Sequence, residues 1–213
     1  MVMSEKTTRG QIVEVADELF YRQGYEFTSF ADIAGAVKIS RGNFYYHFKS
    51  KDEILDAVIG LRLANTRKML ERWEKEGDDP ADRIRSFIHI VIANQARIKL
   101  YGCPVGALCS ELAKVNHPSR AEANKLFTLF RTWLGRQFML LGCKTDADKL
   151  AMHVLAWSQG VATLANAFGD EKFVKHEVSQ MCKWLKLCAG SLGPKRRERN
   201  GAADGASRER GAG

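Results

Sequence analysis

Apolar residues recur at three- and four-residue intervals along most of this chain, which is the spacing of amphipathic helices. No alternating pattern of the kind that predicts strands persists, and prolines are scarce, at four in 213 residues. The predicted fold class is therefore all-α. Beyond residue 50 the predicted helices cover 51–76, 80–99, a short segment ending near Val115, 119–141, 147–168 and 171–190.

Residues 29–48 carry the densest DNA-binding chemistry in the chain. Their pattern predicts two short helices joined by a tight turn. Between Ala36 and Lys51 there are four cations, one histidine and no carboxylate, which suits contact with DNA phosphates. Ser40 is a good N-cap for the second helix, and the positive end of that helix dipole also favours phosphate. Since no comparable cluster of catalytic residues occurs elsewhere, the sequence favours DNA binding over catalysis.

The second short helix, over 41–48, divides into faces when its residues are placed about 100° apart. Phe44 and Phe48 are four positions apart and share the face expected to be buried. Tyr46 is central on the opposite face, where a recognition helix meets base edges. An aromatic packing cluster is the plainer interpretation, but it would not explain the acid-free surroundings. The other residues that this arrangement turns toward bases or phosphates are Gly42, Asn43, Tyr45 and His47.

Several motifs follow one another in a fixed order between residues 8 and 59. They are an amphipathic opening helix, Gly24-Tyr25, Ser29-x-x-Asp-Ile-Ala, Val37-x-x-Ser, Gly42-Asn-Phe-Tyr-Tyr-His-Phe48 and Ser50-Lys-Asp-Glu-Ile-Leu55. This order resembles the N-terminal domain of the TetR family of bacterial transcriptional regulators. The resemblance implies phosphate contacts from Thr28, Ser29, Tyr45, His47 and Lys51, and base contacts from Arg41, Gly42, Asn43 and Tyr46.

The same resemblance implies a larger second domain that binds an effector and forms a homodimer. The chain then divides into a helix-turn-helix domain at 6–66 with its motif at 29–48, an effector-binding and dimerisation domain at 67–192, and a disordered tail at 193–213. The last two predicted helices are apolar over more than the single stripe that a one-sided helix needs. They could be buried within one subunit, but this family typically pairs them across a twofold axis. A homodimer would present two recognition helices to a palindromic DNA operator.

The middle helices supply walls for an effector pocket but no distinctive chemistry. Aromatic residues at helical spacing are more often ordinary core, so each candidate can also be interpreted as packing. The resemblance implies an unknown small-molecule effector that releases a repressor from DNA. The candidate lining residues are Phe87, Val91, Phe127, Phe130, Trp133, Met152 and Trp157.

Cys103 offers a second route of regulation. It stands in Gly102-Cys-Pro-Val-Gly106, a segment that resembles one subgroup of the family, which includes repressors that sense oxidants or electrophiles through a cysteine after this glycine. A cysteine just before a helix N-terminus favours its thiolate form, and Lys99 could add to that effect. Release by a small molecule and release by modification of Cys103 both remain open.

The net charge of +8 is not the reason to expect DNA binding. Residues 1–60 carry nine carboxylates and seven cations, so the basic balance arises elsewhere in the chain. The relevant charge is the local one that faces phosphate. The five cysteines form no Cys-x-x-Cys pair and no histidine has finger spacing, so the sequence predicts no metal site, no cofactor and no disulfide framework.

Missing signals exclude several functional classes. The N-terminus lacks the apolar core of a signal peptide, and no run of about 18 apolar residues predicts a membrane span, so a cytoplasmic protein is expected. No Gly-x-Ser-x-Gly, His-Glu-x-x-His or phosphate-binding loop is present, which argues against an enzyme. Together with the resemblance to TetR regulators, these absences lead us to expect a sequence-specific DNA-binding transcriptional regulator that acts as a repressor.

Overall fold

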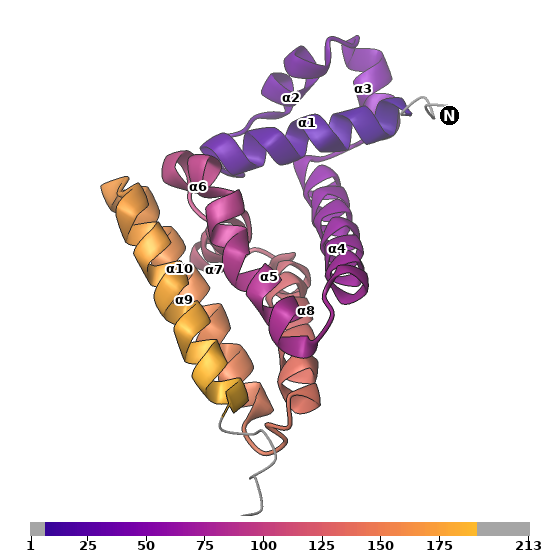
Figure 1. The fold of residues 1–213 in the computed structure, drawn as a ribbon. Helices are drawn as coiled ribbons and strands as arrows, with labels where there is room; N and C mark the ends of the chain where they lie inside the picture. The colour runs from indigo at the N-terminus through magenta and orange to yellow at the C-terminus, as the bar shows by residue number, and fades with distance from the viewer. Residues whose placement is uncertain (1–6, 191–213) are drawn as a thin grey trace, which may run out of the picture.

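The computed structural model describes residues 7–190, and the regular structure within that range is entirely helical (Figure 1). The helices are α1 (Thr8–Gln23), α2 (Phe30–Val37), α3 (Arg41–His47), α4 (Lys51–Glu76), α5 (Pro80–Ala93), α6 (Gln95–Tyr101), α7 (Pro104–Lys114), α8 (Arg120–Leu140), α9 (Ala147–Phe168) and α10 (Glu171–Gly190). The all-α class is thus confirmed. Of the helices within 7–190, none combines the length and the apolar content needed to cross a lipid bilayer. The predicted tail, 193–213, and the first residue of the predicted DNA-binding domain lie outside the described residues.

α1, α2 and α3 form the upper tier of the molecule, and α4 runs down from it (Figure 1). The first hydrophobic core joins these four helices through fully buried side chains such as Ile12, Ile33, Phe44 and Ile54. Its members from two later helices are Leu108, Cys109 and Leu112 on α7 and Ala123 and Leu126 on α8. The domain boundary expected after residue 66 falls inside α4, which continues to Glu76. The DNA-binding tier therefore shares one continuous helix and one core with the rest of the chain.

The helices from α5 to α10 form the lower body of the molecule, with α9 and α10 along the edge away from α4 (Figure 1). α9 packs chiefly on α8, and α10 packs chiefly on α5. A second core fills the space between them, and its larger members are Trp73, Phe87, Phe130, Trp133, Phe138 and Leu155. Leu164 and Phe168 on α9 and Leu187 on α10 remain exposed. Both last helices therefore keep apolar surface uncovered in the single chain.

Most predicted helix boundaries are reproduced, but one predicted helix is in fact two. The helices predicted over 51–76, 147–168 and 171–190 match α4, α9 and α10. The helix predicted over 80–99 is instead divided into α5 and α6 at Asn94, whose φ of −106° and ψ of 10° depart from helical values. The Asn94 side-chain amide donates to the carbonyl of Ile90 at 2.9 Å, and such local bonds compete with continuation of a helix.

Candidate DNA-binding site and effector cavity

Capping side chains fix where α2 and α3 begin. The Ser29 hydroxyl accepts the N–H of Asp32 at 3.1 Å, and the Ser29 N–H donates to the Asp32 carboxylate at 2.8 Å, which completes a capping box. Hydrogen bonds from the side chain and backbone of Ser29 hold the pKa of Asp32 below its ordinary value. Ser40 caps α3 as predicted, because its hydroxyl accepts the N–H of Asn43 at 3.3 Å. The helix-turn-helix motif is thus defined by bonds within its own sequence.

The predicted inward face of α3 is confirmed. Phe44 and Phe48 are both fully buried, and the Phe44 ring meets Phe30 edge to face with centroids 4.6 Å apart. α3 ends at His47, so Phe48 is the residue that follows the helix rather than part of it. Its ring still fills the core, and the opposite face of α3 is left to solvent.

That outward face presents hydrogen-bonding groups without an acid. Tyr46 is 78% exposed, and Tyr45 is half exposed and leans on Phe30 with ring centroids 5.1 Å apart. His47 is half-buried, and its ring lies 5.2 Å from that of Tyr46. A groove of about 270 Å³ separates α2 from α3, and of the described residues that line it none is acidic. The other predicted contact residues that are exposed are Ser29, Ser40, Arg41, Gly42 and Asn43.

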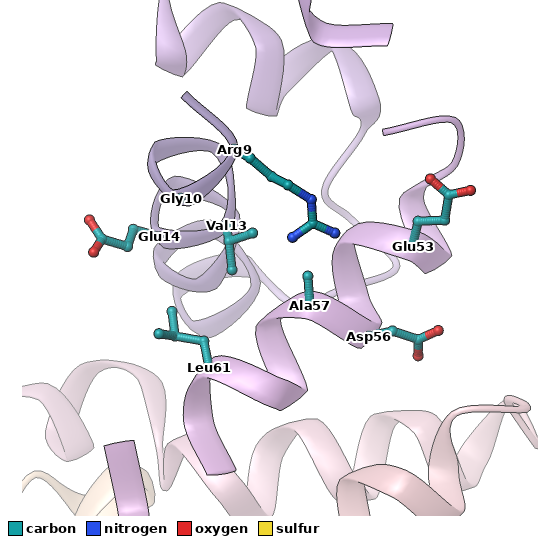
Figure 2. Close-up of a pocket in the computed structure, with 8 residues that line it drawn as sticks. All are labelled: Arg9, Gly10, Val13, Glu14, Glu53, Asp56, Ala57 and Leu61. Carbon is teal, nitrogen blue, oxygen red and sulfur yellow. The ribbon is translucent and has the colours of Figure 1, made fainter. Parts of the chain in front are cut away.

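A second groove, of about 470 Å³, runs between α1 and α4 and has the opposite character (Figure 2). Glu14, Glu53 and Asp56 line it. Arg9 extends from α1 toward α4, with its guanidinium 4.4 Å from the centre of the Phe48 ring. Three carboxylates repel a phosphate backbone, so this side of the tier is unsuited to DNA. DNA is therefore expected to approach across α2 and α3.

Two residues that the resemblance assigns to phosphate are turned inward. Thr28 is fully buried, and its hydroxyl donates to the Gly24 carbonyl at 2.6 Å and accepts from the Gln23 amide at 3.1 Å. It organises the turn between α1 and α2, so its hydroxyl is not free for the phosphate contact that the resemblance implies. The Lys51 ammonium donates to the Tyr25 carbonyl at 3.0 Å and lies 4.1 Å from the centre of that ring. The partner of Lys51 lies 26 residues away in the sequence, so the motif around Lys51 does not reveal it.

An apolar cavity of about 120 Å³ lies between α5, α6, α7, α8 and α9. Phe87, Val91, Phe127, Phe130 and Cys103 line it, and all five were candidates from the sequence. Across residues 7–190, none of the side chains that line it is charged. Its polar lining groups, which the sequence did not single out because helical spacing does not tell which polar positions face inward, are Asn94, Ser158 and Gln159.

The other three candidates from the sequence, Trp133, Met152 and Trp157, do not line this cavity. The Trp133 indole donates to the Glu74 carboxylate at 3.0 Å and packs on Trp73, which assigns it to the core between α4 and α8. Met152 is exposed and lines an open groove between α8 and α9. Trp157 is half-buried against the edges of two core clusters. All three have the helical spacing of core residues, which does not distinguish packing from a ligand contact.

Cys103 is the N-cap of α7, and its sulfur accepts the N–H of Gly106 at 3.4 Å. It is half-buried in the cavity wall. Lys99, expected to support its thiolate, pairs instead with Glu171 at 3.7 Å. Cys109 on the same helix is buried, and burial raises its pKa to about 11. Across the described part of the chain, no three His, Cys, Asp or Glu side chains converge as metal ligands would.

Comparison with known proteins gives the same assignment for both halves of the chain. Residues 12–58 match the model of bacterial regulatory proteins of the tetR family, and residues 80–178 match the C-terminal domain of LmrA/YxaF-like transcriptional regulators. An HTH-type transcriptional regulator encoded in the lacX 3' region of Lactococcus lactis subsp. lactis is 30% identical over 173 residues, which cover 79% of this chain and 88% of that protein. The HTH-type transcriptional regulator TtgR of Pseudomonas putida is 28% identical over 165 residues, or 72% of this chain and 78% of that protein.

A solved structure agrees with these sequence matches. The crystal structure of a TetR transcriptional regulator from Legionella pneumophila superposes with a TM-score of 0.72 at 26% identity, covering 85% of this chain and 99% of that one. The fold, the exposed recognition helix and the two matching sequence models are those of a DNA-binding protein rather than an enzyme. The chain belongs to the TetR family of bacterial transcriptional regulators, with a C-terminal domain of the LmrA/YxaF-like kind.

Proposed function

We propose that this regulator is a repressor that binds a palindromic operator in the bacterial cytoplasm as a homodimer, and that a small neutral molecule in the cavity releases it. The outward face of α3 supports operator recognition, because it offers hydrogen-bonding side chains without a neighbouring acid. In this proposal the base edges meet Arg41, Gly42, Asn43 and Tyr46, and the phosphates meet Ser29, Ser40, Tyr45 and His47.

The homodimer is proposed to form through α9 and α10. Leu164 and Phe168 on α9 and Leu187 on α10 are exposed, and large apolar side chains left in water favour burial against a partner. Ala156 and Gly160, also exposed on α9, would let a second helix approach closely. We expect Phe168→Asp and Leu187→Asp to produce monomers in sedimentation experiments and to weaken operator binding. Dimers that persist in both variants would contradict this interface.

The uncharged lining of the cavity is the observation that carries the effector proposal. A charged ligand would lose its hydration there without gaining a counter-charge. An apolar cavity of about 150 Å³ can bind benzene, so a cavity of about 120 Å³ suits a neutral ligand of about one aromatic ring. Ser158 and Gln159 could satisfy one polar group on such a ligand.

Phenol and benzylamine test this proposal, because they have similar size and differ in charge at pH 7. Phenol is expected to raise the melting temperature and to release operator DNA, and benzylamine to do neither. A ligand at 100 times its Kd adds about 2.7 kcal/mol to the free energy of unfolding. Ala162→Met, which extends a wall residue into the cavity, should abolish the phenol shift. A shift that survives this substitution, or an equal one with benzylamine, would overturn the effector site.

A thiol switch at Cys103 is the alternative, favoured by one observation: this half-buried sulfur stands both at the start of α7 and in the cavity wall. Hydrogen peroxide would oxidise its thiolate to a sulfenic acid and leave hydroxide. We expect peroxide to release operator from the wild type but not from Cys103→Ser if the switch operates. Identical behaviour of the two proteins would remove the thiol proposal and leave the small-molecule effector in place.

A further inference from the structure

The loop between α1 and α2 is held by a carboxylate that lies more than 80 residues later in the sequence. Glu111, on α7, accepts the N–H of Tyr25 at 3.0 Å and the N–H of Glu26 at 2.8 Å, one on each oxygen. Gly24 has a φ of +93°, and a Cβ there would lie 3.0 Å from the Glu111 carboxylate. Glycine therefore provides both the turn and the close approach. Hydrogen bonds to a charged carboxylate are stronger than neutral ones, so Glu111 restrains the backbone of Tyr25 and Glu26.

This loop leads directly into the DNA-reading motif. Thr28 closes it with the bond to the Gly24 carbonyl, and Ser29 begins α2 immediately afterwards. The Tyr25 hydroxyl donates to Asp52 on α4, and burial together with that bond raises the pKa of Tyr25. The ring of His117, which follows α7, packs edge-on against Tyr25 with centroids 5.2 Å apart. The position of α2 relative to α7 is therefore set by contacts on both sides of Tyr25.

The other end of α7 forms part of the cavity wall. Cys103, Pro104 and Val105 line the cavity at the start of this helix. Glu111 follows Pro104 by seven residues of α7, which places it about 10 Å further along the helix axis. A helix with its backbone bonds intact moves as a rigid body, so a displacement of its first turn also displaces its last. α7 therefore connects the cavity to the loop that precedes the helix-turn-helix motif, residues 29–48, which we call the reading motif.

The first turn of α7 also contacts α1. The Pro104 carbonyl accepts from Arg62 at 2.6 Å, and the Arg62 guanidinium donates to Asp17 on α1 at 2.6 Å. The Tyr21 hydroxyl of α1 donates to the Gly102 carbonyl at 2.8 Å. Arg62 is almost fully buried, whereas the Asp17 side chain is 30% exposed, so solvent reaches the Asp17 end of this bridge. The two ends of α7 therefore hold α1 and the loop that follows it.

We propose that Glu111 is a positioning residue for DNA recognition: its carboxylate fixes the orientation of the reading motif relative to the dimerisation body, and α7 carries changes at the cavity to it. The second half of this proposal rests on the effector cavity proposed above, whereas the first half concerns DNA binding alone. In a dimer, the orientation of each reading motif sets the separation of the two recognition helices. Glu111 thereby controls which half-site spacing the dimer accepts.

Half-site spacing provides a measurement that a merely stabilising residue would not alter. The operator is first selected from random-sequence DNA with the wild-type protein, and variants with one central base pair added or removed are then compared. One base pair moves a half-site by about 3.4 Å and rotates it by about 34°. We expect this change to cost the wild type about tenfold in affinity, and Glu111→Ala about threefold, because the released loop lets the motif adjust.

Two further variants make this comparison specific. Glu111→Gln keeps the size of the side chain and one of the two acceptor oxygens, so its spacing penalty should fall between those of the wild type and Glu111→Ala. Glu122→Gln removes a half-exposed carboxylate on α8 that pairs with Lys125, and it should behave as the wild type. Wild-type spacing penalties in both Glu111 variants would overturn the positioning role.

Filling the cavity tests the coupling without a known effector. Ala162→Met is introduced into the wild-type and Glu111→Ala backgrounds, and operator affinity is measured in all four proteins. We expect about a tenfold loss in the wild-type background and a clearly smaller one without Glu111. Equal losses would overturn coupling through Glu111 and leave the effector site standing. If operator affinity falls in neither background, both the effector site and the coupling are overturned. The positioning role of Glu111 is then decided by the half-site spacing experiment alone.

Discussion

The recognition helix and the effector cavity use their side chains in opposite ways. On α3, packing and recognition belong to different residues: Phe44 is fully buried and Tyr46 is 78% exposed. In the cavity the same residues do both, because Phe87 at 2% exposure and Phe130 at 7% are wall and core at once. Substitutions on the recognition surface can therefore change which DNA sequence is preferred without loss of stability. Substitutions that change the ligand preference of the cavity also repack the core.

The strongest test of this contrast is a truncation in the cavity wall. Phe130→Ala should lower the free energy of unfolding by about 3–5 kcal/mol, because it removes a buried ring that contacts Phe87 with centroids 5.3 Å apart. The enlarged cavity should also bind phenol with altered affinity. Urea unfolding with and without phenol measures both effects.

Phe27→Ala is the matched control for that truncation, because Phe27 is 84% exposed in the loop before α2. The same change of side chain there should alter the free energy of unfolding by no more than about 0.5 kcal/mol. A Phe130→Ala protein as stable as Phe27→Ala would mean that the cavity wall is dispensable to the core, and the contrast would fail.

The recognition helix should show the reverse separation. Tyr46→Ala should leave the free energy of unfolding within about 0.5 kcal/mol of the wild type, because the side chain is exposed. It should nevertheless change the preferred operator, by about 1–3 kcal/mol at the base pair it contacts. Selection from random-sequence DNA measures the preference, and Asn43→Ala should change it at a neighbouring position. An unchanged preference in the Tyr46→Ala protein would remove Tyr46 from base recognition.

The same contrast explains what the sequence could predict. The cap and faces of α3 were predictable because Ser40 directly precedes the helix and Phe44 and Tyr46 lie within it, where a spacing of about 100° decides orientation. The cavity is assembled from five helices, so Asn94 and Gln159 could not be recognised as lining residues before their helices were packed together. Thr28 differs from these residues, because its partners Gly24 and Gln23 are local; the motif gives the residue types of this turn but not the inward direction of the Thr28 hydroxyl.

Lys51 belongs to the DNA-binding residues that the sequence predicts, but its side chain is held by a residue from outside the helix-turn-helix. Its ammonium is held by the Tyr25 carbonyl and ring, so we expect it to act by positioning the loop before Ser29. Lys51→Ala should then weaken binding to all DNA sequences by about 1 kcal/mol and leave the salt dependence unchanged. Titrations at several salt concentrations measure both quantities. A decrease of about 0.9 in the slope of log affinity against log salt would instead show that Lys51 contacts a phosphate directly.

Tyr45→Phe is the companion to this measurement, because Tyr45 is half exposed and the substitution removes only its hydroxyl, leaving the ring against Phe30. The Tyr45 hydroxyl is expected to donate an uncharged hydrogen bond to a DNA phosphate. Its loss should therefore weaken binding to all sequences without altering the slope of log affinity against log salt. If the variant binds operator as tightly as the wild type does, and also binds random-sequence DNA as tightly as the wild type does, Tyr45 is not a DNA contact.

The smallest expected effect concerns the capping box that begins α2. The bonds from Ser29 lower the pKa of Asp32, so they stabilise α2 at pH values above the unfolded-state pKa of about 3.9. That contribution is lost as the pH falls through the lowered value in the folded protein. In Ser29→Ala the side-chain bond is gone, and the pKa of Asp32 should move back toward its ordinary value. NMR titration of the Asp32 carboxyl in the two proteins measures the difference, and identical values would mean that α2 depends on its packing against the core, as the cavity helices do.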